Sequence, residues 1–363
     1  CVSGGGLTAA YYALSCDNPD DPATCPPTTN GSARYAWNED TVYPLLERSL
    51  LWRWFGNWFW PHNIARFWFT YYDRTDIMAA TLSNNLYDYS VLANNQFRFR
   101  DLNPTRPNLA INATDVTSTS DEGFHFPFSP EQFRKLRSDL DRYPIANAVM
   151  ASASFPGAFN YVTLRDYSRT DEPRYVHLTD GGAYDNLGLN AIKTAMESAA
   201  NAGPRLRAVI IVDAYPASDD ALAKQPDARG WFDFFLDTNF FVAYDTLLTS
   251  LRRTQLEYAK KLLKDVKGEL LHLSWQTLKD DGEHHALYGR LNRVPTSLNI
   301  TDADASCVKR AAQILVRREL DAIHSNPAHP LRDLITPPKD APSLSPCALG
   351  KKAVAVPAAP AEP

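Results

Sequence analysis

The chain has 363 residues, of which 44% are hydrophobic and 22% are charged, a composition typical of a globular protein with a sizeable core. Its formal net charge of −5 provides no basic field of the kind that attracts nucleic acid, and no stretch approaches the roughly 20 apolar residues of a membrane-spanning helix. These properties exclude a nucleic-acid partner and leave room for one large domain or two ordinary ones.

Predicted helices and strands alternate along the chain. Helices are expected over residues 7–14, 130–140, 186–202, 240–266 and 302–322, and strands over 107–116, 174–179 and 209–212. Asn186 is placed to cap the third helix, and Val209–Val212 is a continuous apolar run typical of a parallel strand buried on both faces. The alternation predicts an α/β fold with a mainly parallel sheet, in which ligands bind at the carboxyl ends of the strands.

The first residues, CVSGGGLTAAYYAL, fit a turn that holds a serine nucleophile. Such a serine needs an exposed tight turn, a base, and hydrogen-bond donors for the oxyanion. In a strand–turn–helix elbow, small residues stand two before and two after the serine, and the N–H after the serine points at the oxyanion. Ser3 fits this place, with Gly5 as the second small residue and Gly4 as the N–H donor. Cys1 stands at the first small position, where the motif has glycine.

Two other interpretations of this stretch stay open. It can be a flexible glycine-rich end with an ordinary serine. Gly4, Gly6 and Ala9 also satisfy the spacing GxGxxA of a dinucleotide cradle, which expects an acidic residue closing a second strand about 20 residues further on. The chain instead has a loop rich in Cys and Pro there, at residues 16–34.

The five cysteines bear on redox state and metal binding. Cys16 and Cys25 flank the turn-rich stretch DNPDDPAT, so they are either a disulfide of an oxidising compartment or two unrelated thiols. Cys1 is also compatible with the acylated cysteine of a lipoprotein. No CxxC or Cys/His cluster has metal-ligand spacing, so neither a metal nor a cofactor is expected.

Residues 41–75 are apolar and aromatic, and LLWRWFGNWFWPHNIARFWF holds five of the eight tryptophans. On a helical wheel over residues 50–60, most apolar side chains share a broad arc. Tryptophan with arginine is the composition of an interfacial membrane helix, which would place Trp52, Trp54, Trp58 and Trp60 at a lipid surface. The alternative is a core or interface helix, because aromatic side chains also dominate cores. The cysteine pair and this segment favour a periplasmic or membrane-associated protein, with the cytoplasm as the alternative.

A second motif, HLTDGGAYDNLGL, places Asp180 at the end of a predicted strand. Gly181 and Gly182 follow it, and glycines there let another backbone or side chain approach the carboxylate closely. An ordinary Asp-Gly-Gly turn is the alternative interpretation. His177 precedes Asp180 by three residues, and this odd offset in a strand directs it to the opposite face.

Three later histidines keep a second type of site open. His272, His284 and His285 all follow Asp180 in the chain, so they would allow the order Ser, Asp, His of an α/β-hydrolase triad. No feature of the sequence singles out one of them.

Both motifs resemble those of bacterial patatin-like phospholipases. VSGGGLTAAYYAL resembles the family's nucleophile elbow, which usually reads GxSGGSLTAAYY, and LTDGGAYDNLGL resembles its Asp-Gly-Gly motif. INATDV and ANAVMASASFPGAFNYV resemble the segments between the two motifs, and VPTSLNIT with the helix after it resembles the family's C-terminal end. The similarity runs from residue 1 to residue 335.

The resemblance implies a three-layer α/β/α patatin-like fold with a mainly parallel central sheet, as one acyl hydrolase domain over residues 1–335. It also implies hydrolysis of carboxylic ester bonds of lipids and phospholipids through a Ser–Asp dyad and an acyl-enzyme. Carried onto this chain, Ser3 resembles the nucleophile and Asp180 the base. A carboxylate can act as this base only if burial raises its pKa. An α/β-hydrolase-type esterase and a non-catalytic lipid-binding relative are the alternatives.

The chain departs from the family pattern at its N-terminus. Cys1 stands where the family has glycine, and Gly6 stands where it usually has serine. The family's glycine-rich oxyanion loop would precede residue 1, so we expect that a longer polypeptide has lost its beginning and that the chain as it stands is nearly inactive. At the other end, residues 336–363 are rich in proline and alanine, which predicts a disordered tail.

Overall fold

The structure is a computed structural model, and it describes residues 1–29, 31, 33–87, 96–119, 124–193, 208–215, 239–266, 268–294, 297–337 and 343–348. The chain forms two compact units. The first comprises residues 1–209, 227–270 and 297–299, and the second comprises residues 210–226, 271–296 and 300–363. That residues 1–335 form one acyl hydrolase domain stays a prediction.

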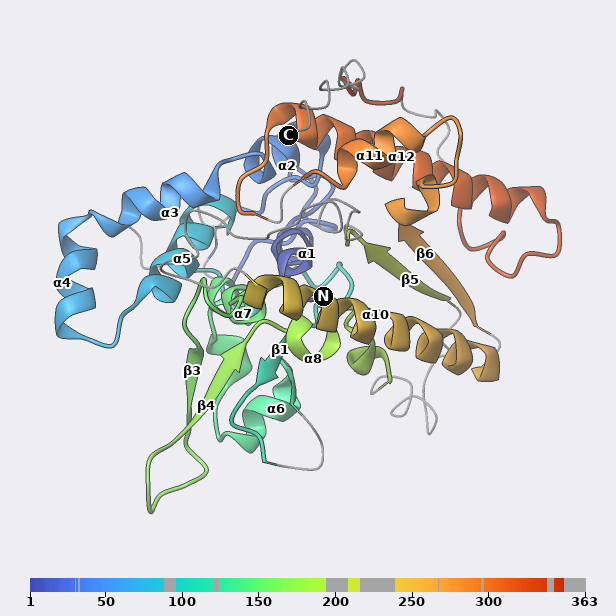
Figure 1. Cartoon of the computed structure of the whole chain (residues 1–363). Coiled ribbons are helices and arrows are strands. Elements are labelled where there is room, and N and C mark those ends of the chain that lie inside the picture. The colour runs from blue at the N-terminus through green and yellow to red at the C-terminus, as the bar shows by residue number, and fades with distance from the viewer. Residues whose placement is uncertain are drawn as a thin grey trace, which may run out of the picture. The chain divides into compact units, whose positions relative to one another are not determined.

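The sheet of the first unit has four strands in the order β2-β1-β4-β3 (Figure 1). These strands are β1 (Asn112–Asp115), β2 (His125–Pro127), β3 (Val162–Asp166) and β4 (Arg174–Thr179). All three pairings are antiparallel, and Thr114 of β1 lies opposite His125 on one side and Thr179 on the other. One parallel contact extends this sheet, an isolated bridge between Val2 and Asn112. The fold is α/β, whereas a mainly parallel central sheet stays a prediction.

The described part of the first unit has many more residues in helices than in strands. They are α1 (Gly4–Leu14), α2 (Glu39–Leu46), α3 (Leu50–Trp58), α4 (Pro61–Phe69), α5 (Arg74–Leu82), α6 (Pro130–Lys135), α7 (Ile145–Ser152), α8 (Gly182–Asp185) and α10 (Asn239–Val266). Polar side chains begin several of them, since Asn38, Ser49 and Asp73 each accept a hydrogen bond from a backbone N–H of the first turn. Pro61 begins α4, where a missing N–H leaves no bond unmade.

Helix α7 is the centre of the first unit's core. Seven of its eight residues are buried, and most of them are small. It lies between α1 and the strands β1 and β4 (Figure 1). On the α1 side it meets Gly6, where an added Cβ would lie 3.7 Å from a methyl of Val149. Short side chains therefore let the serine-bearing helix and the sheet approach α7 closely.

The described residues of the second unit include most of a two-stranded sheet and two α-helices. Strand β5 (Ala208–Asp213) pairs with β6 (Glu269–Ser274), and Figure 1 draws the two side by side in the same direction. Helices α11 (His285–Leu291) and α12 (Asp302–Ser325) pack together over a small core of Leu278, Leu287 and Leu291.

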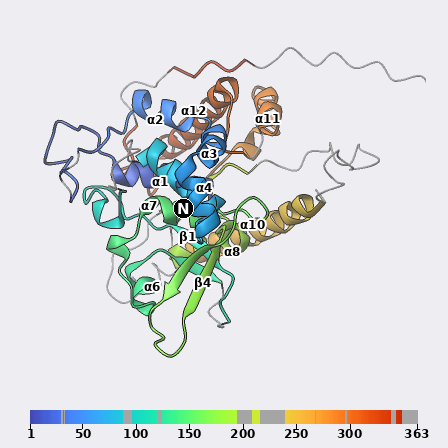
Figure 2. The same ribbon diagram turned by 90° about the vertical axis from the view of Figure 1, so that its left-hand side faces the viewer.

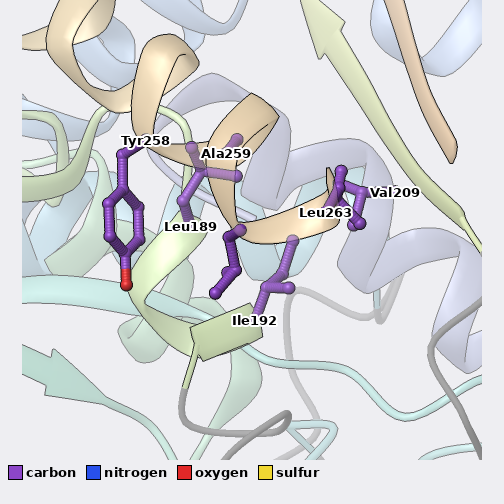
Figure 3. Close-up of a pocket in the computed structure, with 7 residues that line it drawn as sticks. Leu189, Ile192, Val209, Tyr258, Ala259 and Leu263 are labelled. Atoms are coloured by element: carbon purple, nitrogen blue, oxygen red, sulfur yellow. The ribbon is translucent and has the colours of Figure 1, made fainter. Parts of the chain in front are cut away.

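Strand β5 is not buried on both faces, which corrects the expectation from its apolar run. Burial alternates along it: Val209 and Ile211 are buried, whereas Ile210 is 59% and Val212 is 76% exposed. Only one face is covered in the described structure. On that face, Val209 packs against Ala259 and Leu263 of α10 around an apolar pocket of about 10 Å³ (Figure 3). The pocket holds little more than one water-sized sphere and offers no polar partner, so it is a packing contact.

The helix predicted over residues 186–202 begins later than expected. Residues 189–193 are helical, and the rest of that range from 194 lies outside the described residues. The Asn186 cap was a wrong prediction: the carboxylate of Asp185 accepts the N–H groups of Leu189 and Asn190, at 3.0 and 2.7 Å. The turn at Gly188, with φ +69°, separates α8 from this helix and shifts its start.

Two disulfides are present. Cys16 pairs with Cys25 across the turn-rich loop, and Cys307 of α12 pairs with Cys347. The second disulfide bears on the expected disordered tail, because Ser345 in the same segment donates its N–H to Gln313 at 2.8 Å. Residues 343–348 are therefore held on α12, while residues 338–342 and 349–363 of the predicted tail lie outside the described part of the chain.

Among the described residues, no helix combines the length and the apolar character needed to cross a bilayer.

Thiol titration tests both disulfides. In denaturant without reductant, we expect one reactive thiol, that of Cys1, and five after reduction. A Cys1→Ser variant serves as the control, since it should show none before reduction. Three or more thiols in the unreduced wild type would contradict the pairing.

Breaking the Cys307–Cys347 bond with Cys347→Ala should lower the free energy of unfolding of the second unit by about 2–4 kcal/mol, measured by urea denaturation.

Candidate active site

Ser3 lies in a strained turn between the Val2 bridge and the start of α1. Its backbone has φ 48° and ψ −130°, and Arg137 is the only other non-glycine residue of the described structure with a positive φ. A positive φ is unfavourable for a residue with a side chain. The surrounding contacts impose it: Cys1 O accepts the N–H of Asn112 at 3.1 Å, and Val2 O accepts the N–H of Gly5 at 3.0 Å. The turn therefore has the geometry of a nucleophile elbow.

The Ser3 hydroxyl meets the Asp180 carboxylate directly. Ser3 Oγ donates to Asp180 Oδ2 at 2.8 Å, although the two residues are 177 positions apart. Asp180 follows β4 immediately, so the C-terminal end of this strand brings it to Ser3 at the start of α1. Its other oxygen, Oδ1, accepts the N–H of Gly182 at 2.7 Å. Both oxygens of the carboxylate are thus held by hydrogen bonds from fixed groups.

Burial makes the Asp180 carboxylate more basic than an ordinary aspartate. The residue is only 5% exposed, and this desolvation raises its pKa to about 6, against the opposing effect of the hydrogen bonds from Gly182 and Ser3. Near neutral pH the group is therefore ionised and still able to take a proton from a hydroxyl.

Ser152, at the end of α7, connects the elbow to the sheet. Its Oγ accepts the Ser3 N–H at 2.9 Å and donates to the carbonyl of Asn112 at 2.6 Å. Its own carbonyl accepts the N–H of Gly181 at 3.1 Å. One residue thus joins the elbow, β1 and the Asp-Gly-Gly turn. Sequence reasoning missed it, because a serine in a run of small residues carries no signal of such a role.

The two pairs of glycines at the site have different environments. A Cβ at Gly181 would lie 2.2 Å from the carbonyl oxygen of Asn112, and one at Gly182 would lie 3.0 Å from Asp180 Oδ1. These are the close approaches that the motif predicts. A Cβ at Gly4 or Gly5 would have nothing within 4 Å, so no steric need for glycine exists there.

The N-terminus of α1 faces the site. Gly4 is exposed, and its N–H makes no hydrogen bond to any residue that the structure describes. The positive end of the helix dipole lies at the same place. A negative charge that develops next to Ser3 Oγ could therefore be stabilised by this N–H.

Tyr244 of α10 is a further neighbour of the site that the sequence did not indicate. Its ring meets Phe155 edge-on, with 5.2 Å between the ring centroids. Burial, together with the charge of Asp180, raises the pKa of Tyr244 to about 12. The phenol therefore keeps its proton over the whole physiological range.

The histidines have partners of their own. His177 bonds Thr163 on the neighbouring strand at 2.9 Å. Within the second unit, His272 bonds Asp213, His284 bonds Asp281, and His285 bonds the carbonyl of Lys279. Among the described residues, none of the histidines hydrogen-bonds to Ser3 or Asp180. The described part of the chain also contains no cluster of three or more His, Cys, Asp or Glu side chains that could hold a metal.

A comparison with protein families finds a match to this chain. The model of the patatin-like phospholipase family matches residues 2–192, just over half of the chain. The matched range contains both Ser3 and Asp180. No curated protein matches the chain.

Gly181→Ala tests the close approach between the Asp-Gly-Gly turn and β1. Because the added methyl would meet backbone rather than a movable side chain, we expect the free energy of unfolding to fall by about 1–3 kcal/mol. Gly5→Ala is the matched control, since its methyl points into open space, and it should leave stability unchanged or slightly raised. Thermal unfolding followed by circular dichroism measures both, and equal effects of the two variants would contradict the packing described.

Proposed function

Because the chain belongs to the patatin-like phospholipase family, we propose that it hydrolyses carboxylic ester bonds of lipids with Ser3 as nucleophile and Asp180 as general base. The family match supports a lipid acyl hydrolase or phospholipase activity in general. One observation carries the finer proposal, the 2.8 Å hydrogen bond from Ser3 Oγ to a buried carboxylate of raised pKa.

The reaction proceeds in two halves that Asp180 serves in turn. Ser3 Oγ attacks the ester carbon while its proton passes to Asp180 Oδ2, and the Gly4 N–H stabilises the oxyanion of the tetrahedral intermediate. The C–O bond to the leaving alcohol breaks, and Asp180 returns the proton to that alcohol. A water then gives a proton to Asp180 as it attacks the acyl-enzyme. Collapse releases the fatty acid, and the proton returns to Ser3 Oγ.

Several expectations about this activity stay predictions. They include the acyl-enzyme and a periplasmic or membrane-associated location. A reactive fluorophosphonate suits such a protein, because covalent labelling reports the nucleophilicity of a serine even when turnover is slow.

We expect fluorophosphonate to label Ser3, identified by mass spectrometry of the modified peptide. The labelling rate should rise with pH through about 6 and then level off, because protonated Asp180 cannot accept the serine proton. Asp180→Asn should lower the rate at pH 8 by at least about 100-fold, the usual contribution of a general base. Ser3→Ala should abolish labelling.

Alanine substitutions of His272, His284 and His285, made one at a time, are the matched controls for that experiment and distinguish a dyad from a triad. The proposal requires each variant to label at the wild-type rate. Absence of label on Ser3 in folded wild-type protein would instead favour a non-catalytic lipid-binding relative, and loss of labelling in any one of the histidine variants would favour a triad.

Ser152→Ala tests whether this serine positions the nucleophile. Without its hydroxyl, the buried carbonyl of Asn112 and the N–H of Ser3 lose their partner, so we expect a loss of about 1–3 kcal/mol in stability. The labelling rate should also fall, while the pH at its midpoint stays near 6. Ser154→Ala is the control, because among the described residues that equally buried hydroxyl bonds only the carbonyl of Ala151. A labelling rate unchanged by Ser152→Ala would show a purely structural role.

A further inference from the structure

Helices α3 and α4 expose an unusual number of large aromatic side chains. Trp52 is 68% exposed, Phe59 76%, Trp68 74% and Phe69 86%. Within the first unit these helices lie at the outer edge beyond α5, and they come to the foreground when the molecule is viewed from that side (Figures 1 and 2). Isolated exposed aromatics are ordinary, but contiguous apolar patches mark surfaces for a partner or a membrane.

The aromatic residues of α3 divide into a buried and an exposed stripe. Trp54 is only 7% exposed, its indole N–H donates to the carbonyl of Arg74 at 2.9 Å, and its ring lies 5.0 Å from that of Phe159. Trp52, Phe55 and Phe59 follow one another at helical spacing on the exposed side. Trp54 therefore fixes α3 to the unit and is unable to contact a lipid surface, and the partly buried Trp58 packs against the same core.

Helix α4 has almost no attachment of its own. Asn63 is its only buried residue, and the side-chain amide of Asn63 donates to the carbonyl of Asn57 at 2.9 Å. Its large apolar side chains all remain accessible to solvent: Ile64, Phe67, Trp68 and Phe69, with Trp60 just before the helix. The fold thus holds α4 in place without using its apolar surface.

The charge of this segment differs from that of the rest of the chain. Residues 48–72 contain Arg48, Arg53 and Arg66 but no Asp or Glu, whereas the whole chain has a net charge of −5. Arg53 and Arg66 are exposed among the aromatic residues. A second copy of this surface would bring like charges together, whereas an anionic lipid surface would attract them.

We propose that the exposed aromatic residues of α3 and α4 form a docking surface for an anionic lipid bilayer, with Trp52, Phe59, Trp60, Trp68 and Phe69 entering the interface. Indole and phenyl rings partition to the boundary between headgroups and acyl chains, and arginine binds lipid phosphate. This proposal rests on the proposed function in one respect: an enzyme that hydrolyses lipids has to reach them in a bilayer.

The docking surface is connected to the catalytic carboxylate by a short path. Trp54 of α3 packs on Phe159, and the N–H of Phe159 donates to the carbonyl of Phe155 at 3.1 Å. Ser154, the preceding residue, accepts the backbone N–H of Asp180 at 3.1 Å. Helix α3 therefore rests on the same loop that holds the base, which would keep a docked bilayer in a fixed relation to the site.

Co-sedimentation with vesicles tests the proposal. Wild-type protein should pellet with phosphatidylcholine vesicles that contain phosphatidylglycerol. The double variant Trp68→Ser/Phe69→Ser should bind at least about tenfold more weakly, because two large rings no longer leave water. The variant Arg53→Gln/Arg66→Gln should lose about fivefold for each arginine on these vesicles, and much less on phosphatidylcholine alone.

Tyr167→Ser/Tyr175→Ser is the matched control, because it removes two exposed aromatic rings from the β3–β4 hairpin instead. It should bind like the wild type, and circular dichroism melting should show that all variants fold. Measuring binding also in a Ser3→Ala background separates docking from catalysis, since that variant should pellet normally even if no esterase activity is ever found.

Three results would overturn the proposal: wild-type protein that does not pellet, a Trp68→Ser/Phe69→Ser variant that pellets like the wild type, or a wild-type dimer that this variant dissociates in analytical ultracentrifugation without any vesicle binding.

Discussion

A buried carboxylate in contact with the elbow serine constrains every segment around it. Removing the charge of Asp180 from water is unfavourable unless hydrogen bonds compensate. The two bonds that do so come from Ser3 and from Gly182, so the start of α1 and the turn after β4 must both be in place. The same burial raises the pKa of the carboxylate. The burial that is unfavourable for stability is thus also what supports the proposed role of Asp180 as a base.

The site is tightly packed on one side and open on the other. Toward β1, the chain at Gly181 approaches the carbonyl of Asn112 so closely that no side chain fits. Toward the N-terminus of α1, Gly4 and Gly5 face open space. The packed side fixes the distance between serine and carboxylate, while the open side leaves room for an ester to approach the hydroxyl, as the proposed reaction requires.

Much of this arrangement could be predicted from the sequence, because glycine motifs and helical periodicity are local signals. The resemblance of the two motifs to those of the patatin-like family predicted that Ser3 and Asp180 act together, and the structure brings them into contact, although the catalytic roles stay proposals. What the sequence could not reveal depends on the packing of distant segments. Ser152 acquires its three contacts only when α7 meets the elbow and β1. Likewise, Trp52 and Trp54 look equivalent in an aromatic run, and only the contacts of Trp54 with Phe159 and with the carbonyl of Arg74 show which of them is buried.

The positive φ of Ser3 has a consequence for how this protein can change over evolutionary time. Glycine would adopt that backbone conformation without strain. A mutation of the serine codon to a glycine codon would therefore relieve the strain in the turn and remove the proposed nucleophile. Selection for thermodynamic stability alone would therefore favour glycine over serine at this position. A lineage that ceased to need hydrolysis would be expected to lose the hydroxyl early and to retain the surrounding fold, leaving a stable lipid-binding descendant.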